Sequence, residues 1–194
     1  MKRNTQTTDF PSAELLRKEI RRENYRRRFA RAMTSTFFTL VVVAAVAVLI
    51  ATIWMPVLQI YGSSMSPTLN EGEIVVAVKG SKFESGDLVS FYIGNKLLVK
   101  RYIAGPGQWV EIDQAGNVFV SGQPLDEPYL IEKALGDCNI EFPYQVPDNR
   151  IFCLGDHRAT SLDSRNTAVG CISEEQIVGK IVFRVWPFNT FGCV

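Results

Sequence analysis

The chain has 194 residues, enough for one domain with appendages, and its formal net charge is +1. The charge is divided unevenly: residues 1–31 contain ten Lys or Arg and four Asp or Glu, whereas residues 32–194 contain eleven and sixteen. An acidic domain behind a basic arm argues against nucleic-acid binding by the domain. Four cysteines without CxxC spacing and a single histidine argue against a zinc site and against a disulfide scaffold.

The first segment, residues 1–33, is predicted to be a basic cytoplasmic arm. Residues 1–11 are polar and are expected to fray, and residues 12–31 are expected to form a helix with Ser12 as N-cap and Glu14 in the first turn. Arginines make up almost all of its polar surface. Nucleic-acid binding would use such a run too, but the segment that follows favours a membrane function.

Residues 34–55 are 22 consecutive residues without a charge. As a helix they would span about 33 Å, which matches a hydrocarbon core of about 30 Å. Arginines end just before this run, so the positive-inside rule places the N-terminus in the cytoplasm and residues 56–194 outside. A cleaved signal peptide is the alternative, but the run is longer than a usual h-region and no A-x-A site directly follows it. We therefore expect a single-pass cell-membrane protein.

Residues 56–194 predict a mainly β domain, because short β-branched segments alternate with turns at a spacing near ten residues. We expect an all-β fold that is closed or folded over on itself. Residues 109–112 and 118–120 predict a hairpin, residues 123–149 a loop, and residues 174–177 a short helical turn. The other expected strands are residues 74–78, 88–93, 97–103, 151–154 and 178–185. Cys153 is expected to be a buried thiol, although a bridge to Cys171 stays open.

A polar turn at residues 61–69 follows the apolar run and contains three serines, one threonine, Gly62 and Pro67. Gly and Pro can fix such a turn so that one hydroxyl lies near backbone N–H groups. If Ser64 or a neighbour is a nucleophile, it needs a base, and the only histidine is His157. The alternatives are an ordinary Ser/Pro loop and a solvated histidine in a turn.

Lys100 is a second candidate for that base. Strand alternation puts Lys100 and Arg101 on opposite faces of an otherwise mainly apolar strand, so one of the two is expected to be partly buried. Burial lowers the pKa of a lysine from about 10.4, and a lysine near 7–8 is a competent general base. A lysine that extends from a strand edge into water is the alternative.

A third group of polar residues, GDHRATSLDSR at residues 155–165, contains two acids, two arginines and three hydroxyls. Asp–Arg pairs can be bidentate and rigid. This segment therefore predicts either a hydrogen-bonded platform or a salt-bridged surface loop.

Four motifs in this order resemble those of type I signal peptidase, the bacterial membrane-bound serine peptidase. They are GSSMSPTL at residues 62–69, GDLV at 86–89, VKR at 99–101 with GPG at 105–107, and GDHRATSLDSR at 155–165. RVWP at residues 184–187 is similar to the C-terminal strand of that family. The resemblance covers about residues 58–192 and implies a signal-peptidase-like folded β-sheet or barrel, here behind one N-terminal transmembrane helix.

The resemblance implies a serine endopeptidase that removes N-terminal signal peptides from exported preproteins after a small-x-small motif, with neither cofactor nor metal. Ser64 would be the nucleophile, Lys100 its general base, and Ser161 the hydroxyl that orients the amine. The partners would be preprotein signal peptides emerging from the export machinery, and the lipid bilayer. The remaining implied residues are the supporting charges Asp163, Arg165, Asp156 and Arg101, the substrate-pocket residues Ile60, Val99 and Met65, and the oxyanion donors Ser64 and, as a weak candidate, Ser63.

The chain departs from the family pattern at three positions. Gly62 stands where some relatives have a serine that helps the oxyanion hole, His157 replaces the commoner Asn, and Gln108 replaces a common Asp. Two other functions stay open: a specialised Ser/Lys processing peptidase for a narrow substrate set such as pilins, and a catalytically silent anchored binding module. We also expect residues 54–61, with Met65 and Leu69, to dip into the membrane interface.

Overall fold

The computed structural model describes residues 12–194 of the chain. The chain divides into two compact units, Met1–Ile50 and Ala51–Val194. The predicted fraying of residues 1–11 lies outside the described residues. We call residues 51–194 the β domain, because apart from the last turn of a helix it consists of strands, turns and two short 3-10 helices.

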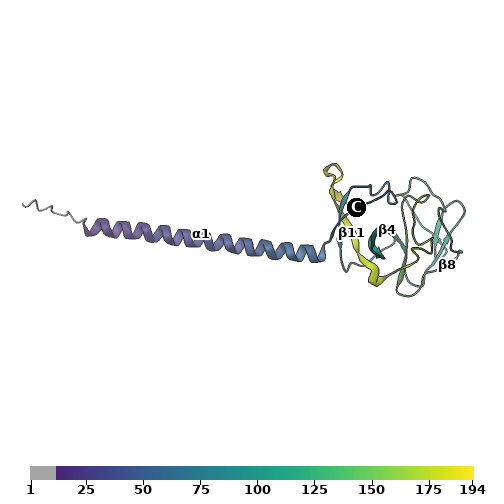
Figure 1. Ribbon diagram of the computed structural model, residues 1–194, viewed down its shortest axis with the longest axis horizontal. Coiled ribbons are helices and arrows are strands. Elements are labelled where there is room, and N and C mark those ends of the chain that lie inside the picture. Colours follow the sequence, from purple (N-terminus) through teal and green to yellow (C-terminus); the bar gives the residue numbers. More distant parts are fainter. Residues whose placement is uncertain (1–11) are drawn as a thin grey trace, which may run out of the picture. The chain divides into compact units, whose positions relative to one another are not determined.

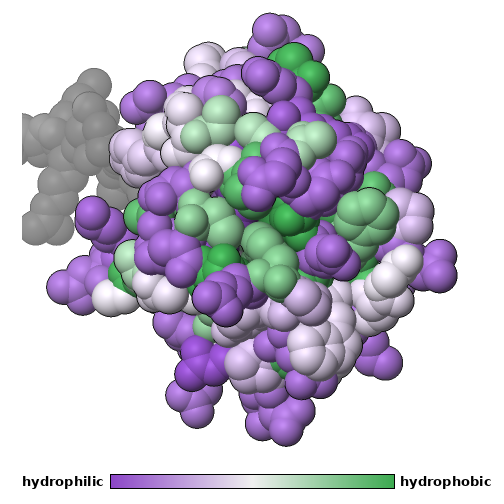
Figure 2. All heavy atoms as spheres, turned by 90° about the vertical axis from the view of Figure 1, so that its right-hand side faces the viewer, coloured by the Kyte–Doolittle hydropathy of each residue, from purple (hydrophilic) through white to green (hydrophobic). Residues whose placement is uncertain are grey.

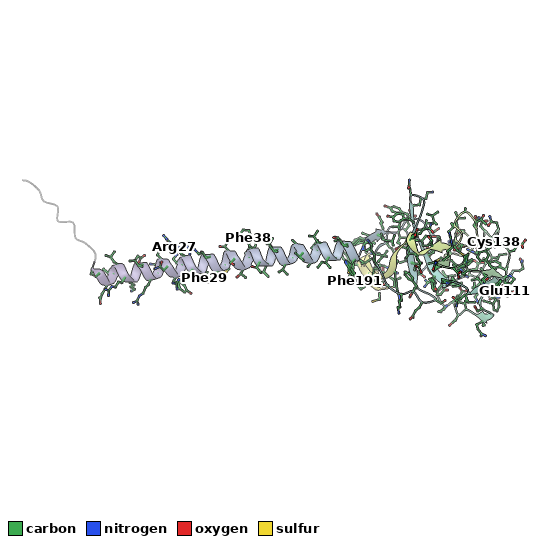
Figure 3. All side chains as sticks on the ribbon, turned by 90° about the horizontal axis from the view of Figure 1, so that it is seen from below. Arg27, Phe29, Phe38, Glu111, Cys138 and Phe191 are labelled. Atoms are coloured by element: carbon green, nitrogen blue, oxygen red, sulfur yellow. The ribbon has the colours of Figure 1, made fainter. Side chains whose placement is uncertain are left out.

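One continuous helix, α1 (Ala13–Trp54), covers both the arginine-rich segment and the apolar run. It begins where the sequence predicted, and its first backbone bond runs from the Leu16 N–H to the Ser12 carbonyl at 3.2 Å. No residue of α1 is buried, and Figure 3 shows Arg27, Phe29 and Phe38 projecting outward from it. Among residues 12–194 it is the one helix long and apolar enough to cross a membrane, which suits an anchor.

The larger sheet of the β domain has eight antiparallel strands in the order β1-β2-β11-β3-β4-β9-β10, with β12 paired to β11. Figure 1 labels β11 and β4 of this sheet. The mainly β prediction is confirmed, and the predicted strand positions are right to within one residue. The strands are β1 (Val57–Gln59), β2 (Ile74–Val78), β3 (Leu88–Ile93), β4 (Lys96–Ala104), β9 (Arg150–Leu154), β10 (Ile172–Ser173), β11 (Ile177–Trp186) and β12 (Gly192–Cys193).

The smaller sheet has four strands in the order β7-β6-β5-β8. They are β5 (Trp109–Ile112), β6 (Val118–Val120), β7 (Gln123–Pro124) and β8 (Tyr144–Gln145). The predicted hairpin is confirmed, with Val110 opposite Val120. The predicted loop at residues 123–149 is irregular over most of its length but contributes the two-residue strands β7 and β8. The predicted helical turn is the 3-10 helix η1 (Glu174–Gln176), and a second one, η2 (Phe188–Thr190), was not predicted.

Buried apolar side chains form three clusters in the β domain: one between the small sheet and β9, one around β2 and the polar turn, and one around β3 and β9. Cys153 is fully buried in the third cluster, as expected. The possible bridge to Cys171 is not formed, because all four thiols are free. Figure 2 shows one outer face of this domain, where hydrophobic residues lie in small groups among hydrophilic ones.

Strand register brings Lys100 into the middle of the larger sheet. Val89 of β3 lies opposite Lys100 of β4, and Leu154 of β9 lies opposite Arg101. Strand β4 pairs with β3 from Lys96 to Arg101 and with β9, on its other side, only from Arg101 to Ala104. The residues before Lys100 therefore have a free strand edge toward the polar turn.

Phe91 and Tyr92 are neighbours in β3 whose side chains point to opposite faces of the larger sheet, since they are 0% and 49% exposed. Substituting each of them therefore tests the register of β3. Phe91→Ala should lower the free energy of unfolding by about 3–5 kcal/mol, because it leaves a cavity in the third cluster. Tyr92→Ala should change it by no more than about 1 kcal/mol. Urea unfolding of the full chain in detergent micelles measures both, and equal losses would contradict the register.

Candidate active site

Lys100 is a buried amine with a defined partner. Its residue is 2% exposed, and its Nζ donates a hydrogen bond of 2.9 Å to Ser161 Oγ. Burial lowers the pKa of Lys100 from 10.5 to about 8, an effect that Asp163 and Asp156 oppose and Arg165 assists. The desolvation dominates because an ammonium loses its water shell while no carboxylate contacts it directly.

Every other buried charge near Lys100 already has its own partner. Arg165 and Asp163, both fully buried, form two parallel bonds of 2.8 Å, from Nε to Oδ1 and from Nη2 to Oδ2. Arg101 likewise grips Asp156 from Nε at 2.8 Å and from Nη2 at 2.5 Å. Because both carboxylates are committed to arginines, Lys100 is left with a neutral hydroxyl.

The charged side chains and Ser161 of residues 155–165 are buried and form a platform, so the alternative of a salt-bridged surface loop is wrong. Asp163, Ser161 and Arg165 are each 0% exposed. The Gly155 N–H donates to Asp163 Oδ2 at 3.0 Å, so the ion pair also fixes the start of the platform. The platform thus holds the Ser161 hydroxyl in a place set by buried bonds.

Ser64 lies in the polar turn between β1 and β2, and the platform holds its backbone. The His157 N–H donates to the Ser64 carbonyl at 3.1 Å. A Cβ at Gly155 would lie 2.1 Å from Ser161 Oγ and 2.6 Å from the Ser64 carbonyl oxygen. Only glycine therefore lets the Ser64 backbone and the Ser161 hydroxyl pack against the same residue. Ser64 and Lys100 line one common hollow.

Thr68 ties the same turn to Asp156. Its Oγ1 donates to Asp156 Oδ2 at 2.5 Å, and Arg101 Nη2 lies 3.2 Å from that hydroxyl. The turn is also anchored through its apolar side chains, since Met65 is 2% exposed and Leu69 is 0% exposed. The expectation that Met65 and Leu69 reach the membrane interface is therefore wrong: both pack into the core, because the turn needs an anchor on the domain side.

The predicted pocket residues lie together in a groove of about 590 Å³. Ile60, Val99 and Met65 all line it, beside Ser64, and β1 and the first half of β4 form its two sides. Strand β1 pairs only with β2, and β9 pairs with β4 only from Arg101 onward. Both sides of the groove thus have free backbone groups among the described residues.

Three other residues named from the sequence, Ser63, His157 and Gln108, make their contacts mainly within their own turns. Ser63 is exposed, and its carbonyl accepts from the Ser66 N–H at 3.0 Å. The His157 ring is exposed and contacts Thr160 Oγ1 through Nδ1 at 3.1 Å, whereas its backbone is what contacts Ser64. Gln108 accepts the Gly105 N–H at 2.7 Å and so closes its own turn. Within residues 12–194, no group of three or more His, Cys, Asp or Glu could hold a metal ion.

Two contacts that support the platform were not predicted from the sequence: the ion pair of Glu127 with Arg158 and the stacking of Arg101 on Tyr129. Glu127 forms a buried ion pair with Arg158, whose Nε donates to the Gly155 carbonyl at 3.1 Å. The Arg101 guanidinium lies 3.7 Å from the centre of the Tyr129 ring. No local pattern reveals this ion pair, because Glu127 lies in a segment without regular structure and its partner is 31 residues away. Only the fold brings them together.

Comparison with known proteins identifies the family. The family model described as signal peptidase, peptidase S26, matches residues 33–186. Signal peptidase IB of Staphylococcus aureus (strain COL) is 40% identical over 153 residues, which are 68% of this chain and 78% of that protein. Signal peptidase I S of Bacillus subtilis (strain 168) is 34% identical over 162 residues, 77% of this chain and 87% of the relative.

A crystal structure of a signal peptidase I from Enterococcus faecalis V583 is also similar, with a TM-score of 0.42 and 24% sequence identity, covering 52% of this chain and 97% of that one. The extent of the family match and the identity to these two relatives decide the assignment. The chain belongs to the signal peptidase I family of hydrolases, peptidase S26.

Proposed function

We propose that this chain is a membrane-bound serine endopeptidase that cleaves signal peptides from exported preproteins, with Ser64 as nucleophile and Lys100 as general base. The observation that carries the proposal is the state of Lys100: buried, unpaired with any carboxylate, and with a pKa lowered to about 8 by burial. Such an amine is partly neutral at physiological pH and can accept a proton. Ser64 lines the same hollow as this amine.

The first half of the reaction forms an acyl-enzyme. Neutral Lys100 removes the proton of Ser64 Oγ, and the oxygen attacks the scissile carbonyl carbon. The Ser64 backbone N–H is the first candidate to hold the oxyanion, and Ser63, exposed beside it, is the candidate for a second donor. When the tetrahedral intermediate collapses, Lys100 gives its proton to the departing amine. The bond to the mature protein breaks, and the signal peptide stays on Ser64.

The second half releases the signal peptide. Lys100, neutral again, takes a proton from water, and the oxygen attacks the ester carbon. Ser64 recovers its proton from Lys100 when the ester breaks. Ser161 keeps the amine oriented through the 2.9 Å bond, and Asp163 with Arg165 and Asp156 with Arg101 hold the platform. Each half of the reaction returns Lys100 to its neutral state, because the proton that it accepts in the attack step is given up when the intermediate collapses.

The groove beside Ser64 would receive the end of the signal peptide as an extended strand. Free edges on β1 and on residues 96–99 can pair with it by strand addition. Ile60, Met65 and Val99 narrow the groove with apolar side chains. Small residues would fit there and larger ones would clash, which accounts for a small-x-small preference.

The membrane arrangement follows from charge and length. Residues 34–55 within α1 would cross the bilayer as a single span, residues 1–33 would lie in the cytoplasm, and residues 56–194 would lie outside. The β domain would then meet signal peptides as they emerge from the export machinery. Trp54, Met55, Val57 and Tyr61 are exposed apolar residues at the junction and suit the interface.

Removing either proposed catalytic group should abolish cleavage of a preprotein. Ser64→Ala and Lys100→Met should each lower kcat/KM at least about 1,000-fold, because the nucleophile or its base is lost. The control is Lys133→Met at an exposed lysine of the β domain, which should keep wild-type activity. Cleavage by the Lys100→Met chain at more than a tenth of the wild-type rate would contradict the proposed dyad.

The pH dependence of the acylation rate should report the pKa of Lys100. The neutral amine is the active form, so the rate should rise with pH, with a midpoint at about 8. At pH 6 only about one hundredth of the amine is neutral, and the rate should fall accordingly. Single-turnover cleavage between pH 5.5 and 10 measures this profile. A rate that still rises steeply at pH 10 would contradict the lowered pKa of Lys100, and a rate that falls over this range would argue for a different base.

Asp163→Asn should have two effects. It removes a charge that raises the pKa of Lys100 while Arg165, which lowers it, remains, so the midpoint of the rate profile should move below about 8. Breaking a buried ion pair should also lower the free energy of unfolding by about 3–5 kcal/mol. Rate profiles recorded below the unfolding temperature of the variant separate the change in pKa from the loss of stability. An upward shift of the midpoint would contradict the proposed effect of Asp163 on the pKa of Lys100.

A further inference from the structure

A second hollow of about 480 Å³ opens next to Ser64 and is distinct from the groove described above. The two share Gly62, Ser64, Lys96 and Leu98, so they meet at the proposed nucleophile. The second hollow alone is lined by Lys100 and by the platform residues Thr160 and Leu162. Its other lining residues are Ser63, Ile93, Ala168 and Val169.

The chemistry of Lys100 decides which part of a substrate each hollow receives. This inference rests on the proposed function, in which Lys100 returns its proton to the departing amine. That amine must therefore lie within hydrogen-bond reach of the lysine when the bond breaks. Because Lys100 lines the second hollow and not the first, the chain beyond the cut must leave through the second.

The lining of the second hollow shows what it can bind. Ile93, Leu98 and Val169 pack against the buried cluster around β3 and β9, so this wall is preformed. Leu162 of the platform also lines the hollow and is 47% exposed, so its apolar side chain is only partly covered. Among the described residues, Lys96 and Lys100 are the charged ones that line the hollow, and none of its lining residues is a carboxylate. An apolar or acidic side chain fits these walls, whereas a basic one meets like charge.

We infer that the second hollow is a binding site for the side chain of one of the first two residues of the mature protein, and that it selects apolar or acidic residues over basic ones. The chain would thus discriminate substrates on both sides of the cut. Selection before the cut uses the narrow groove with Ile60 and Val99. Selection after the cut uses Leu162 and Val169 for apolar contact and Lys96 for charge.

A substrate panel tests this inference directly. Peptides keep one small-x-small segment and carry Leu, Glu or Lys at the first or second position after the cut. For the wild-type full chain, kcat/KM should be about tenfold higher with Leu or Glu than with Lys at one of these positions. Equal values for all three residues at both positions would overturn the inference while leaving the proposed function intact.

Two matched leucine variants separate the two hollows. Leu162 lines only the second hollow and Leu58 only the first. Leu162→Ala should reduce the preference for Leu after the cut at least threefold and leave the preference before the cut unchanged. Leu58→Ala should do the reverse. If both variants altered the same side of the cut, the assignment of the second hollow would be wrong.

A charge reversal provides an independent test. Lys96→Glu should invert the preference between Glu and Lys after the cut, since the rim of the hollow changes sign. An unchanged preference would overturn the inference that the second hollow selects acidic residues. Failure of the wild-type chain to cleave any peptide of the panel, or a full preprotein, would instead refute the proposed function on which this inference rests.

Discussion

The constraint on which the site depends is the shortage of carboxylates around Lys100. Three buried arginines of the site, Arg101, Arg158 and Arg165, each hold one buried acid, and these are Asp156, Glu127 and Asp163. The site therefore has three pairs and one additional amine. A charged Lys100 would leave the buried cluster with an unmatched positive charge, whereas a neutral one balances it. Burial and pairing thus act together to lower the pKa of the lysine.

This arrangement also explains why many buried hydrogen bonds and ion pairs fix the platform. Among residues 12–194, the Ser161 hydroxyl is the one hydrogen-bond partner of the Lys100 amine, at 2.9 Å, and it must stay in place when the amine gains and loses its proton. Arg165 bonds the carbonyls of Arg158 and Leu135, at 3.0 Å and 2.6 Å, besides Asp163. Rigid ion pairs therefore position a neutral hydrogen bond, and that bond positions the reactive amine.

Much of the fold could be predicted from the sequence because its signals are local. Alternation, β-branched runs and Gly or Pro turns placed β3 and the β5–β6 hairpin correctly, and the uncharged run marked the apolar part of α1. The boundary expected between the basic helix and the apolar run does not interrupt α1, because nothing between them breaks a helix. The strands β7 and β8 were missed because two residues carry no periodicity.

The candidate site was predictable where motifs carry it and not where only the fold creates a contact. Ser64, Lys100 and Ser161 were named from their motifs, and the fold brings them to one place. The pairing of Glu127 with Arg158 and the stacking of Arg101 on Tyr129 join residues far apart in the chain, so no spacing rule indicates them. The interface expected at Met65 and Leu69 failed for a related reason, since the sequence does not tell which apolar residues of a turn face inward.

The most direct measurement is the titration of the Lys100 amine itself. In the full chain labelled with ¹³C- and ¹⁵N-lysine, the Lys100 signal can be assigned by its absence in Lys100→Met. In the resting protein we expect a pKa of about 8 for Lys100, well below the ordinary lysine value of about 10.4. A value near 10.4 would mean that the amine stays charged in its buried site, and it would contradict the role of Lys100 as the base.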